Sequence, residues 1–378
     1  MSIRNRLSLS RAMPRHQSSM HRFASWLRLA GIGLIAALAP FARADVGVTT
    51  LPATADDDPV TVFYRSTQPA TEFPVGSWAG AYARDAVPEP GNGRLVVISH
   101  GSGGSPWVHG GLARALVAAG YVVAVPRHHA DNAGDPSQPG PDSWTRRPVE
   151  VSHAIDRMAQ DPRFAPLLQL DAVGVYGMSA GGHTALELAG GQWSPTGFRD
   201  HCRVHMAEDF PACVGLATGQ DGNLLDPLKR WVARQVIDWR FRDAQPRHHT
   251  DPRIAAVVAA VPFAADFDMA TLVQPAVPLA LATADGDRWL APRFHGDRVL
   301  RACARCEHLV GLPNGGHGAY LDPLPPGVGG RLGELINDPP GFERTVEPAI
   351  EAKVVDFFNR RLAPATGGAL SIGSSASP

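Results

Sequence analysis

From residue 94 onward, short runs of β-branched and apolar residues alternate with stretches whose apolar positions recur at helical spacing. Such alternation is typical of βαβ units, in which helices cover both faces of a mostly parallel sheet. The apolar runs predict strands at residues 95–99, 121–126, 172–176, 254–261, 279–283 and 308–312. The intervening and following stretches predict helices at residues 108–119, 149–158, 180–189 and 346–362. The pattern therefore predicts an α/β fold around one central sheet.

Residues 192–252 interrupt this alternation. The stretch contains two cysteines, several aromatic residues and one further helical stretch at 227–241. We expect this stretch to form a lid-like insertion folded over one end of the sheet. It would then lie above the carboxyl ends of the strands, where ligands of open α/β sheets bind. One domain then spans residues 45–364, with the insertion inside it. The Gly/Ser-rich residues 365–378 are expected to form a disordered tail.

Residues 1–44 differ from the rest of the chain. They are rich in Arg and Ser, contain no acidic residue, and carry an apolar run at 29–39 followed by Ala42-Arg43-Ala44. This arrangement predicts a secretory signal with an A-x-A cleavage site, and hence a periplasmic or secreted protein. A membrane anchor is the alternative, but the run is shorter than the roughly 20 residues that span a bilayer. No later segment is apolar enough, so no span is expected in the mature chain.

The charges nearly cancel, with 35 Lys and Arg residues against 36 Asp and Glu residues. Without a global basic field, nucleic acid is not an expected partner. The 39 glycines and 34 prolines indicate many tight turns between buried elements. A chain of 378 residues with this composition fits a globular enzyme, and its oligomeric state is left open.

Four cysteines give an even count, which in an oxidising compartment indicates disulfides. We prefer the pairs Cys202 with Cys213 and Cys303 with Cys306, although the other two connectivities are formally open. Cys303-Ala-Arg-Cys306 has an alternative interpretation as a redox or metal dithiol. The second C-x-x-C or His pair that a zinc site needs is missing nearby.

The strongest chemical signal is Gly177-Met178-Ser179-Ala180-Gly181, between the predicted strand 172–176 and the predicted helix 180–189. In that context it is a nucleophile elbow, in which a sharp strand-to-helix turn exposes the serine hydroxyl. The strained turn leaves room only for glycine two residues to either side of the serine. Ser179 is therefore the predicted nucleophile.

A serine hydroxyl needs a base to take its proton and an acid to orient that base. In elbow-bearing folds the order along the chain is Ser, acid, His. His317 follows the strand 308–312 in a glycine-rich loop and is the predicted base. Asp287 is the preferred acid because it sits further into its loop than Asp285, while Asp266 and Asp268, one strand earlier, are retained as alternatives.

Acyl transfer also needs donors aimed at the developing oxyanion. The backbone N–H of Ala180, directly after the nucleophile, is one expected donor. The other is the N–H of Ser102, in the glycine-rich loop 100–104. A dinucleotide loop is the alternative, but the G-x-G-x-x-G spacing fails. The adjacent histidines 128–129 and 248–249 lack metal spacing and are interpreted as polar loop residues.

Several blocks of the chain together resemble the bacterial α/β hydrolases known as predicted dienelactone hydrolases, which are similar to the platelet-activating-factor acetylhydrolases. The likeness covers most of residues 58–362 and rests on residues 95–104, 121–128, 147–148, 173–182, 251–262, 278–287 and 313–320. The resemblance implies an α/β-hydrolase fold. By the same likeness, the catalytic triad is Ser179, Asp287 and His317, with Ser102 and Ala180 as oxyanion donors.

The resemblance also has two departures. True dienelactone hydrolases use a cysteine nucleophile where this chain has Ser179, so the family label is a poor guide to substrate. In acetylhydrolase relatives the acid lies one strand earlier, which keeps Asp266 and Asp268 open.

These observations predict hydrolysis of a small-molecule or lipid-like ester through an acyl-enzyme, with no metal or organic cofactor. Trp107, Trp289 and Tyr320 lie near predicted strand ends, and they suggest an apolar, partly aromatic substrate pocket that Trp144 and Trp193 extend. A peptidase or an acyltransferase on the same triad is a second hypothesis. A catalytically inactive binding protein is a third, because hydrolase folds also serve as interaction modules.

Overall fold

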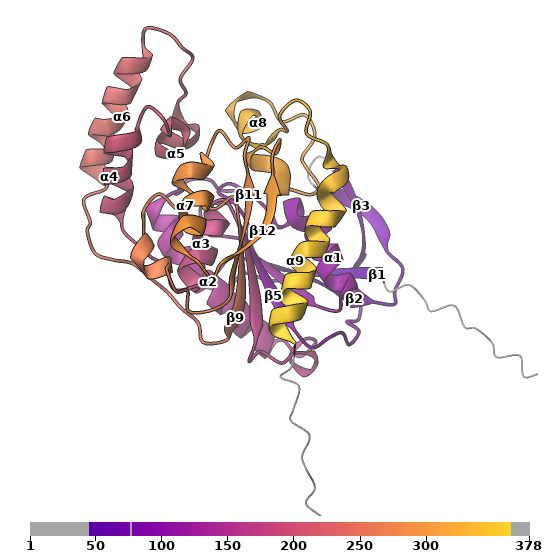
Figure 1. The fold of residues 1–378 in the computed structure, drawn as a ribbon. Coiled ribbons are helices and arrows are strands. Elements are labelled where there is room, and N and C mark those ends of the chain that lie inside the picture. Colours follow the sequence, from indigo (N-terminus) through magenta and orange to yellow (C-terminus); the bar gives the residue numbers. More distant parts are fainter. Residues whose placement is uncertain (1–44, 76–77, 364–378) are drawn as a thin grey trace, which may run out of the picture. The chain divides into compact units, whose positions relative to one another are not determined.

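The computed structural model describes residues 45–75 and 78–363, so the predicted signal at 1–44 and the predicted tail at 365–378 lie outside the described residues. Within them, a sheet runs in the order β12-β11-β9-β7-β5-β6-β2-β1-β4-β3 (Figure 1). Its parallel part contains every strand predicted from the sequence, with ends that differ by no more than two residues. These strands are β5 (Leu95–Ser99), β6 (Val122–Pro126), β7 (Val173–Met178), β9 (Ile254–Ala260), β11 (Leu279–Ala284) and β12 (Glu307–Leu312).

Four N-terminal strands extend the sheet and were not predicted. They are β1 (Asp45–Leu51), β2 (Val60–Ser66), β3 (Thr71–Val75) and β4 (Trp78–Arg84). Strand β2 pairs antiparallel with both β6 and β1, and β3 pairs antiparallel with β4. In the sheet order, β5 and β6 separate these four strands from β7, which leads into the elbow.

Helices cover both faces of the sheet. Successive residues of a strand point to opposite faces, and in β5 the side chains of Leu95 and Val97 join one apolar core while Val96 and Ile98 join the other. On the first face lie α2 (Pro141–Gln160) and α3 (Ala180–Leu188), and on the second lie α1 (Gly110–Ala118) and α9 (Glu347–Leu362). Among the described helices, none is long and apolar enough to cross a membrane.

The predicted start of helix α2 at residue 149 is wrong. The helix begins at Pro141, a residue type that suits the first turn, and continues through Pro148. Proline inside a helix removes one backbone hydrogen bond. The buried face of the helix nevertheless continues past Pro148, because Trp144 and Arg147 before it and Val151 after it are all buried.

The interrupting stretch forms a group of helices beside the sheet, at the upper left of Figure 1. The predicted helix 227–241 is present as α6. The elements of this stretch are β8 (Gln192–Trp193), α4 (Pro195–His205), α5 (Phe210–Val214), η3 (Gly215–Ala217) and α6 (Asp226–Arg240). Strand β8 pairs with β10 (Phe267–Asp268), which anchors the start of the stretch to the body. That residues 192–252 act as a lid remains a prediction.

Both preferred cysteine pairs are present as disulfides. Cys202–Cys213 joins α4 to α5, and Cys303–Cys306 closes the turn before β12. The pairing of Cys303 with Cys306 makes these sulfurs unavailable as a metal dithiol in this structure. The remaining elements are α7 (Gly296–Ala302), α8 (Gly330–Ile336), η1 (Pro106–His109), η2 (Ala165–Leu167), η4 (Met269–Leu272), η5 (Pro292–Phe294), η6 (His317–Tyr320) and η7 (Arg344–Val346).

Candidate active site

Ser179 occupies the sharp turn between β7 and α3. Its backbone φ of 61° lies in the left-handed region that side chains other than glycine rarely adopt, as expected of a strained elbow. The neighbouring glycines are required by space. A β-carbon on Gly177 would overlap the carbonyl oxygen of Gly181, and one on Gly181 would overlap the carbonyl oxygen of Ser99. The sequence argument for glycine at these two positions is therefore confirmed.

Three side chains from separate loops form one hydrogen-bonded chain. Ser179 Oγ lies 2.9 Å from His317 Nε2, and His317 Nδ1 lies 2.7 Å from Asp287 Oδ2. In the tautomer with Nδ1 protonated, His317 donates to Asp287 and accepts from the serine hydroxyl. The second carboxylate oxygen of Asp287 accepts from the backbone N–H groups of Trp289 at 2.8 Å and Leu290 at 2.9 Å. These donors fix the carboxylate in the loop after β11.

The other candidate acids lie elsewhere. Asp285 is exposed, and Asp268 caps the turn η4 by accepting from the N–H of Ala270. The buried carboxylate of Asp266 lies 3.1 Å from the Nε2 atom of His183, which is buried too. The geometry therefore brings Asp287, and not Asp266 or Asp268, to the imidazole of His317.

The glycine-rich loop after β5 lies directly against the nucleophile. A β-carbon built on Gly101 would stand 3.3 Å from the Ser179 β-carbon, an approach that suits a residue without a side chain. The loop is held by Asp131, whose Oδ1 accepts from the Ser102 hydroxyl at 2.5 Å and from the Gly103 N–H at 3.0 Å. The loop thus stands beside Ser179, and the oxyanion roles of Ser102 and Ala180 stay predictions.

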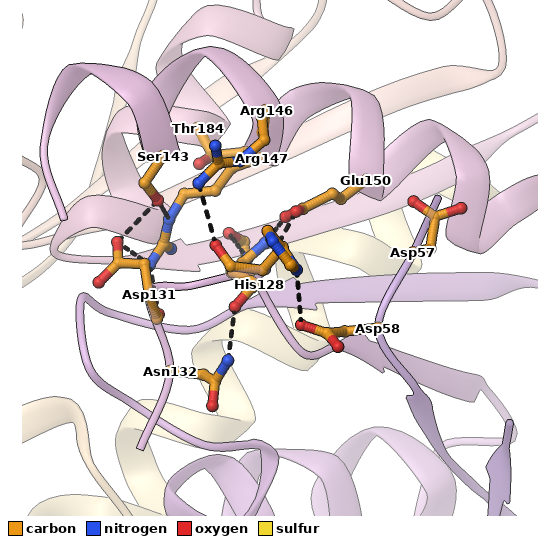
Figure 2. Close-up of polar contacts among 12 residues, drawn as sticks. Asp57, Asp58, His128, Asp131, Asn132, Ser143, Arg146, Arg147, Glu150 and Thr184 are labelled. Carbon is orange, nitrogen blue, oxygen red and sulfur yellow. Dashed lines mark hydrogen bonds and ion pairs between the residues drawn. The ribbon is translucent and has the colours of Figure 1, made fainter. Parts of the chain in front are cut away.

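Beneath this loop lies a buried ion pair that the sequence analysis did not identify (Figure 2). Arg147, fully buried on α2, reaches Asp131 Oδ2 at 2.8 Å and the carbonyl oxygen of His100 at 2.5 Å. Ser143 bridges the pair, accepting from Arg147 and donating to Asp131. Burial alone would raise the pKa of Asp131, but the Arg147 charge and the hydroxyl donors, including Ser102, hold it below its ordinary value.

His128 adds a second buried contact to the same region. Its Nδ1 lies 2.5 Å from Glu150 Oε2 (Figure 2). Its Nε2 lies 2.8 Å from Ser99 Oγ, at the end of β5. Burial, together with the Arg147 charge, lowers the pKa of His128 well below the ordinary value, so the imidazole is neutral. His128 thus lies in the loop after β6, as predicted, but it is buried, whereas its neighbour His129 is exposed.

A cleft of about 860 Å³ opens beside His317. Its walls come from α5, from the loop after Asp287, and from the segment around α8. Charged and polar side chains dominate the lining, which includes Gln220, Asp221, Arg288, Arg331, Glu334, Asn337 and Asp338. The prediction of an apolar, partly aromatic pocket therefore does not fit the lining of this cleft, which is mainly polar and contains Phe210 and Trp289 as its aromatic residues.

Of the aromatic residues predicted to contact substrate, only Trp289 lines the cleft. The ring of Trp107 packs against Phe63 and Phe73 at the N-terminal strands. Tyr320 is buried, and its hydroxyl donates to the carbonyl oxygen of Thr283. Trp144 and Trp193 pack against each other and against the ring of His183. A position near a predicted strand end therefore did not distinguish aromatic residues that line the cleft from aromatic residues that pack in the core.

Within the described residues, no group of three or more His, Cys, Asp or Glu side chains is arranged to hold a metal ion.

No protein-family model matches the chain, and no curated protein matches it. Among solved structures, it is similar to a ferulic acid esterase from Streptomyces cinnamoneus, with a TM-score of 0.55 and 17% identity. The match covers 87% of this chain and 94% of the esterase chain. At this identity the likeness establishes the fold, which is the α/β-hydrolase fold.

Proposed function

We propose that this protein is an exported serine hydrolase that cleaves carboxylic esters through an acyl-enzyme. The observation that carries the proposal is the hydrogen-bonded chain from Ser179 through His317 to Asp287. The esterase with a similar fold supports it, as does the resemblance to the predicted dienelactone hydrolase branch. The two disulfides are compatible with an oxidising compartment and so with export.

In the proposed reaction, Ser179 Oγ attacks the ester carbonyl while its proton passes to His317 Nε2. The carboxylate of Asp287 stabilises the imidazolium that forms. The backbone N–H groups of Ala180 and Ser102 stabilise the developing oxyanion. His317 then protonates the departing alcohol, and a water molecule activated by the same imidazole releases the acid and restores Ser179.

The cleft gives a first indication of substrate. Its polar walls favour an ester with hydrogen-bonding groups near the scissile bond over a bare long-chain acyl group. Arg288 follows the triad acid directly, is exposed at the cleft, and has no acidic partner among the residues that the structure describes. We therefore expect short or polar small-molecule esters to be turned over better than long saturated ones.

Turnover of p-nitrophenyl esters of increasing chain length, alongside a feruloyl ester, tests the proposal. Wild type is expected to hydrolyse the short esters, and Ser179→Ala to lose at least about 10⁴-fold in kcat. Ser137→Ala, at an exposed serine, is the matched control and keeps full activity. A fluorophosphonate should add to wild type but not to Ser179→Ala in intact-mass spectra. Absence of both turnover and labelling would favour the inactive binding protein.

A further inference from the structure

Helix α6 carries an exposed apolar surface. Twelve large apolar side chains are exposed among the described residues, and seven of them lie within residues 224–239. Leu224 is 99% exposed, Trp231 58% and Trp239 69%. We name as the outer face of α6 the residues Leu228, Trp231, Val232, Val236 and Trp239. Two exposed tryptophans on one helix are unusual, because soluble proteins rarely expose large apolar patches. Patches of this kind mark interaction sites.

The helix already has a buried side, so the outer face is not needed for packing within the chain. Ile237 is 4% exposed and Asp226 is 8% exposed, and Ala233 packs against the same core. At 100° per residue, Leu228, Val232 and Trp239 project from the side opposite Ile237. In Figure 1, α6 lies at the edge of the helical insertion. Its outer face thus points away from the residues that hold the helix in place.

Basic residues flank this outer face. Helix α6 contains four basic residues, Lys229, Arg230, Arg234 and Arg240, against two acidic ones. The helical spacing puts Lys229 and Arg240 along one border of the apolar face. Arg234 lies beyond the other border, next to Asp238, whereas Arg230 lies near Ile237 on the opposite side of the helix. Lys229 pairs with Asp221 and Arg240 lies 4.0 Å from Asp142, but Arg234 has no acidic partner in the part of the chain that the structure describes.

We propose that the outer face of α6 binds an anionic phospholipid surface. An amphipathic helix with Trp and Leu on one face and Arg or Lys at its borders lies in the interface of a bilayer instead of spanning it. Tryptophan suits that position because its ring is apolar and its N–H is polar. The arginines meet anionic headgroups, each contributing to attraction at low salt. A second copy of the chain fits less well, because paired α6 helices would bring the same positive borders together.

The position of α6 links this surface to the cleft. Gln220 and Asp221, in the segment that leads into α6, line the cleft beside His317. Lys229 donates to Asp221 Oδ2 at 2.7 Å, which ties the first turns of the helix to the cleft rim. Docking through α6 would therefore hold the cleft close to the lipid surface. The lipid contact itself does not depend on the proposed ester hydrolysis.

Vesicle co-sedimentation of the full-length protein tests the proposal. We expect binding to vesicles of phosphatidylglycerol mixed with phosphatidylcholine, weak binding to phosphatidylcholine alone, and a blue shift of tryptophan emission on binding. Raising salt from about 0.1 M to about 1 M shortens the Debye length from about 10 Å to about 3 Å and should release the protein. Trp231→Ser with Trp239→Ser should lower the partition coefficient about tenfold or more, and Arg234→Gln with Arg240→Gln about 10- to 30-fold.

The matched control is Val87→Ser with Val273→Ser, which removes two exposed apolar side chains outside α6. All variants carry the same N-terminal segment, so a difference between them reports on α6. Circular dichroism and turnover of a soluble ester should be unchanged in every variant. Vesicle binding without turnover would overturn only the proposed function. Failure to bind anionic vesicles, equal binding by the double tryptophan variant, or conversion of a wild-type dimer to a monomer by that variant would each overturn the lipid proposal.

Discussion

Although they lie 30 residues apart in the chain, His317 Nδ1 and Asp287 Oδ2 are 2.7 Å from each other. The two residues follow neighbouring parallel strands, β12 and β11, so both loops emerge at the same edge of the sheet. The carboxylate is held from the other side by two backbone N–H donors. This arrangement fixes the ring of His317 and leaves its Nε2 directed at Ser179.

Asp287→Asn should lower kcat by about 10⁴-fold, because an amide cannot hold the imidazole in the required tautomer or stabilise its charge. Asp285→Asn changes an exposed carboxylate in the same loop and should leave kcat within about twofold. Asp266→Asn should instead lower the free energy of unfolding by about 1–3 kcal/mol, because it disturbs the buried contact with His183. A larger kcat loss in Asp266→Asn than in Asp287→Asn would reassign the acid.

The site shows where sequence reasoning reaches its limit. Ser179 and His317 carry local signals, an elbow and a glycine-rich loop after a strand. The choice of Asp287 among four aspartates depended on which loop tip reaches the imidazole, which is a property of the packed sheet. Arg147 had no local signal, since its partner Asp131 is 16 residues away and meets it only once β6 and α2 are packed.

The sequence likewise predicted one part of the fold, the parallel strands, and missed another, the N-terminal strands. Strands such as β5 and β7 alternate with helices and are apolar throughout, so periodicity detects them. The strands β1 to β4 have no helix between them, and β3 contains Pro74, so a search for strand–helix alternation passes over them. Trp107 was misplaced because its ring packs on those same strands.

Arg147→Met should lower the free energy of unfolding by about 3–5 kcal/mol, because it leaves the buried Asp131 carboxylate without its counter-charge. Urea unfolding gives this value. Turnover should also fall, since Asp131 holds Ser102 and Gly103 in the loop beside the nucleophile. Arg146→Met, at the neighbouring arginine whose hydrogen bonds are exposed, is the control and should lose less than about 1 kcal/mol.

A second variant separates the charge from the lost volume. Adding Asp131→Asn to Arg147→Met removes the unpaired charge and should recover part of the stability. If the double variant is no more stable than Arg147→Met alone, the ion pair is not what holds the loop.

Glu351 should make stability depend on pH. Burial, with the charge of Asp322 beside it, raises the pKa of Glu351 from 4.5 to about 8. The folded state therefore holds a proton that the unfolded chain releases above about pH 4.5. The stabilisation is fully present below that pH and is lost as pH rises through about 8.

Glu351→Gln keeps a donor for Asp322 and removes the titration. We expect its melting temperature to exceed that of wild type by a margin that grows between about pH 5 and pH 8 and is constant above. Glu72→Gln, at an exposed carboxylate, serves as the control. A margin that does not change over this range would show that the Glu351 carboxyl does not retain its proton.

The two disulfides should differ in what their loss does. In the chain-entropy view, a longer closed loop restricts the unfolded chain more, so Cys202→Ala with Cys213→Ala should cost about 3 kcal/mol and Cys303→Ala with Cys306→Ala about 2 kcal/mol. Each variant removes one disulfide and serves as the control for the other.

The Cys202–Cys213 bond also has a local consequence, because α5 supplies Phe210 and Pro211 to one wall of the cleft. Without the disulfide, the hydrogen bonds of Asp209, directly before α5, to His201 and His295 remain, but the covalent link between α5 and α4 is lost. Ester KM should therefore rise for substrates that fill the cleft, while kcat for the smallest soluble ester stays within about twofold, because the Ser179–His317 contact involves neither cysteine. The Cys303–Cys306 variant should leave both constants unchanged. Steady-state kinetics on a short and a bulky ester separate these outcomes, and an equal KM rise in the two disulfide variants would mean that α5 does not shape the substrate site.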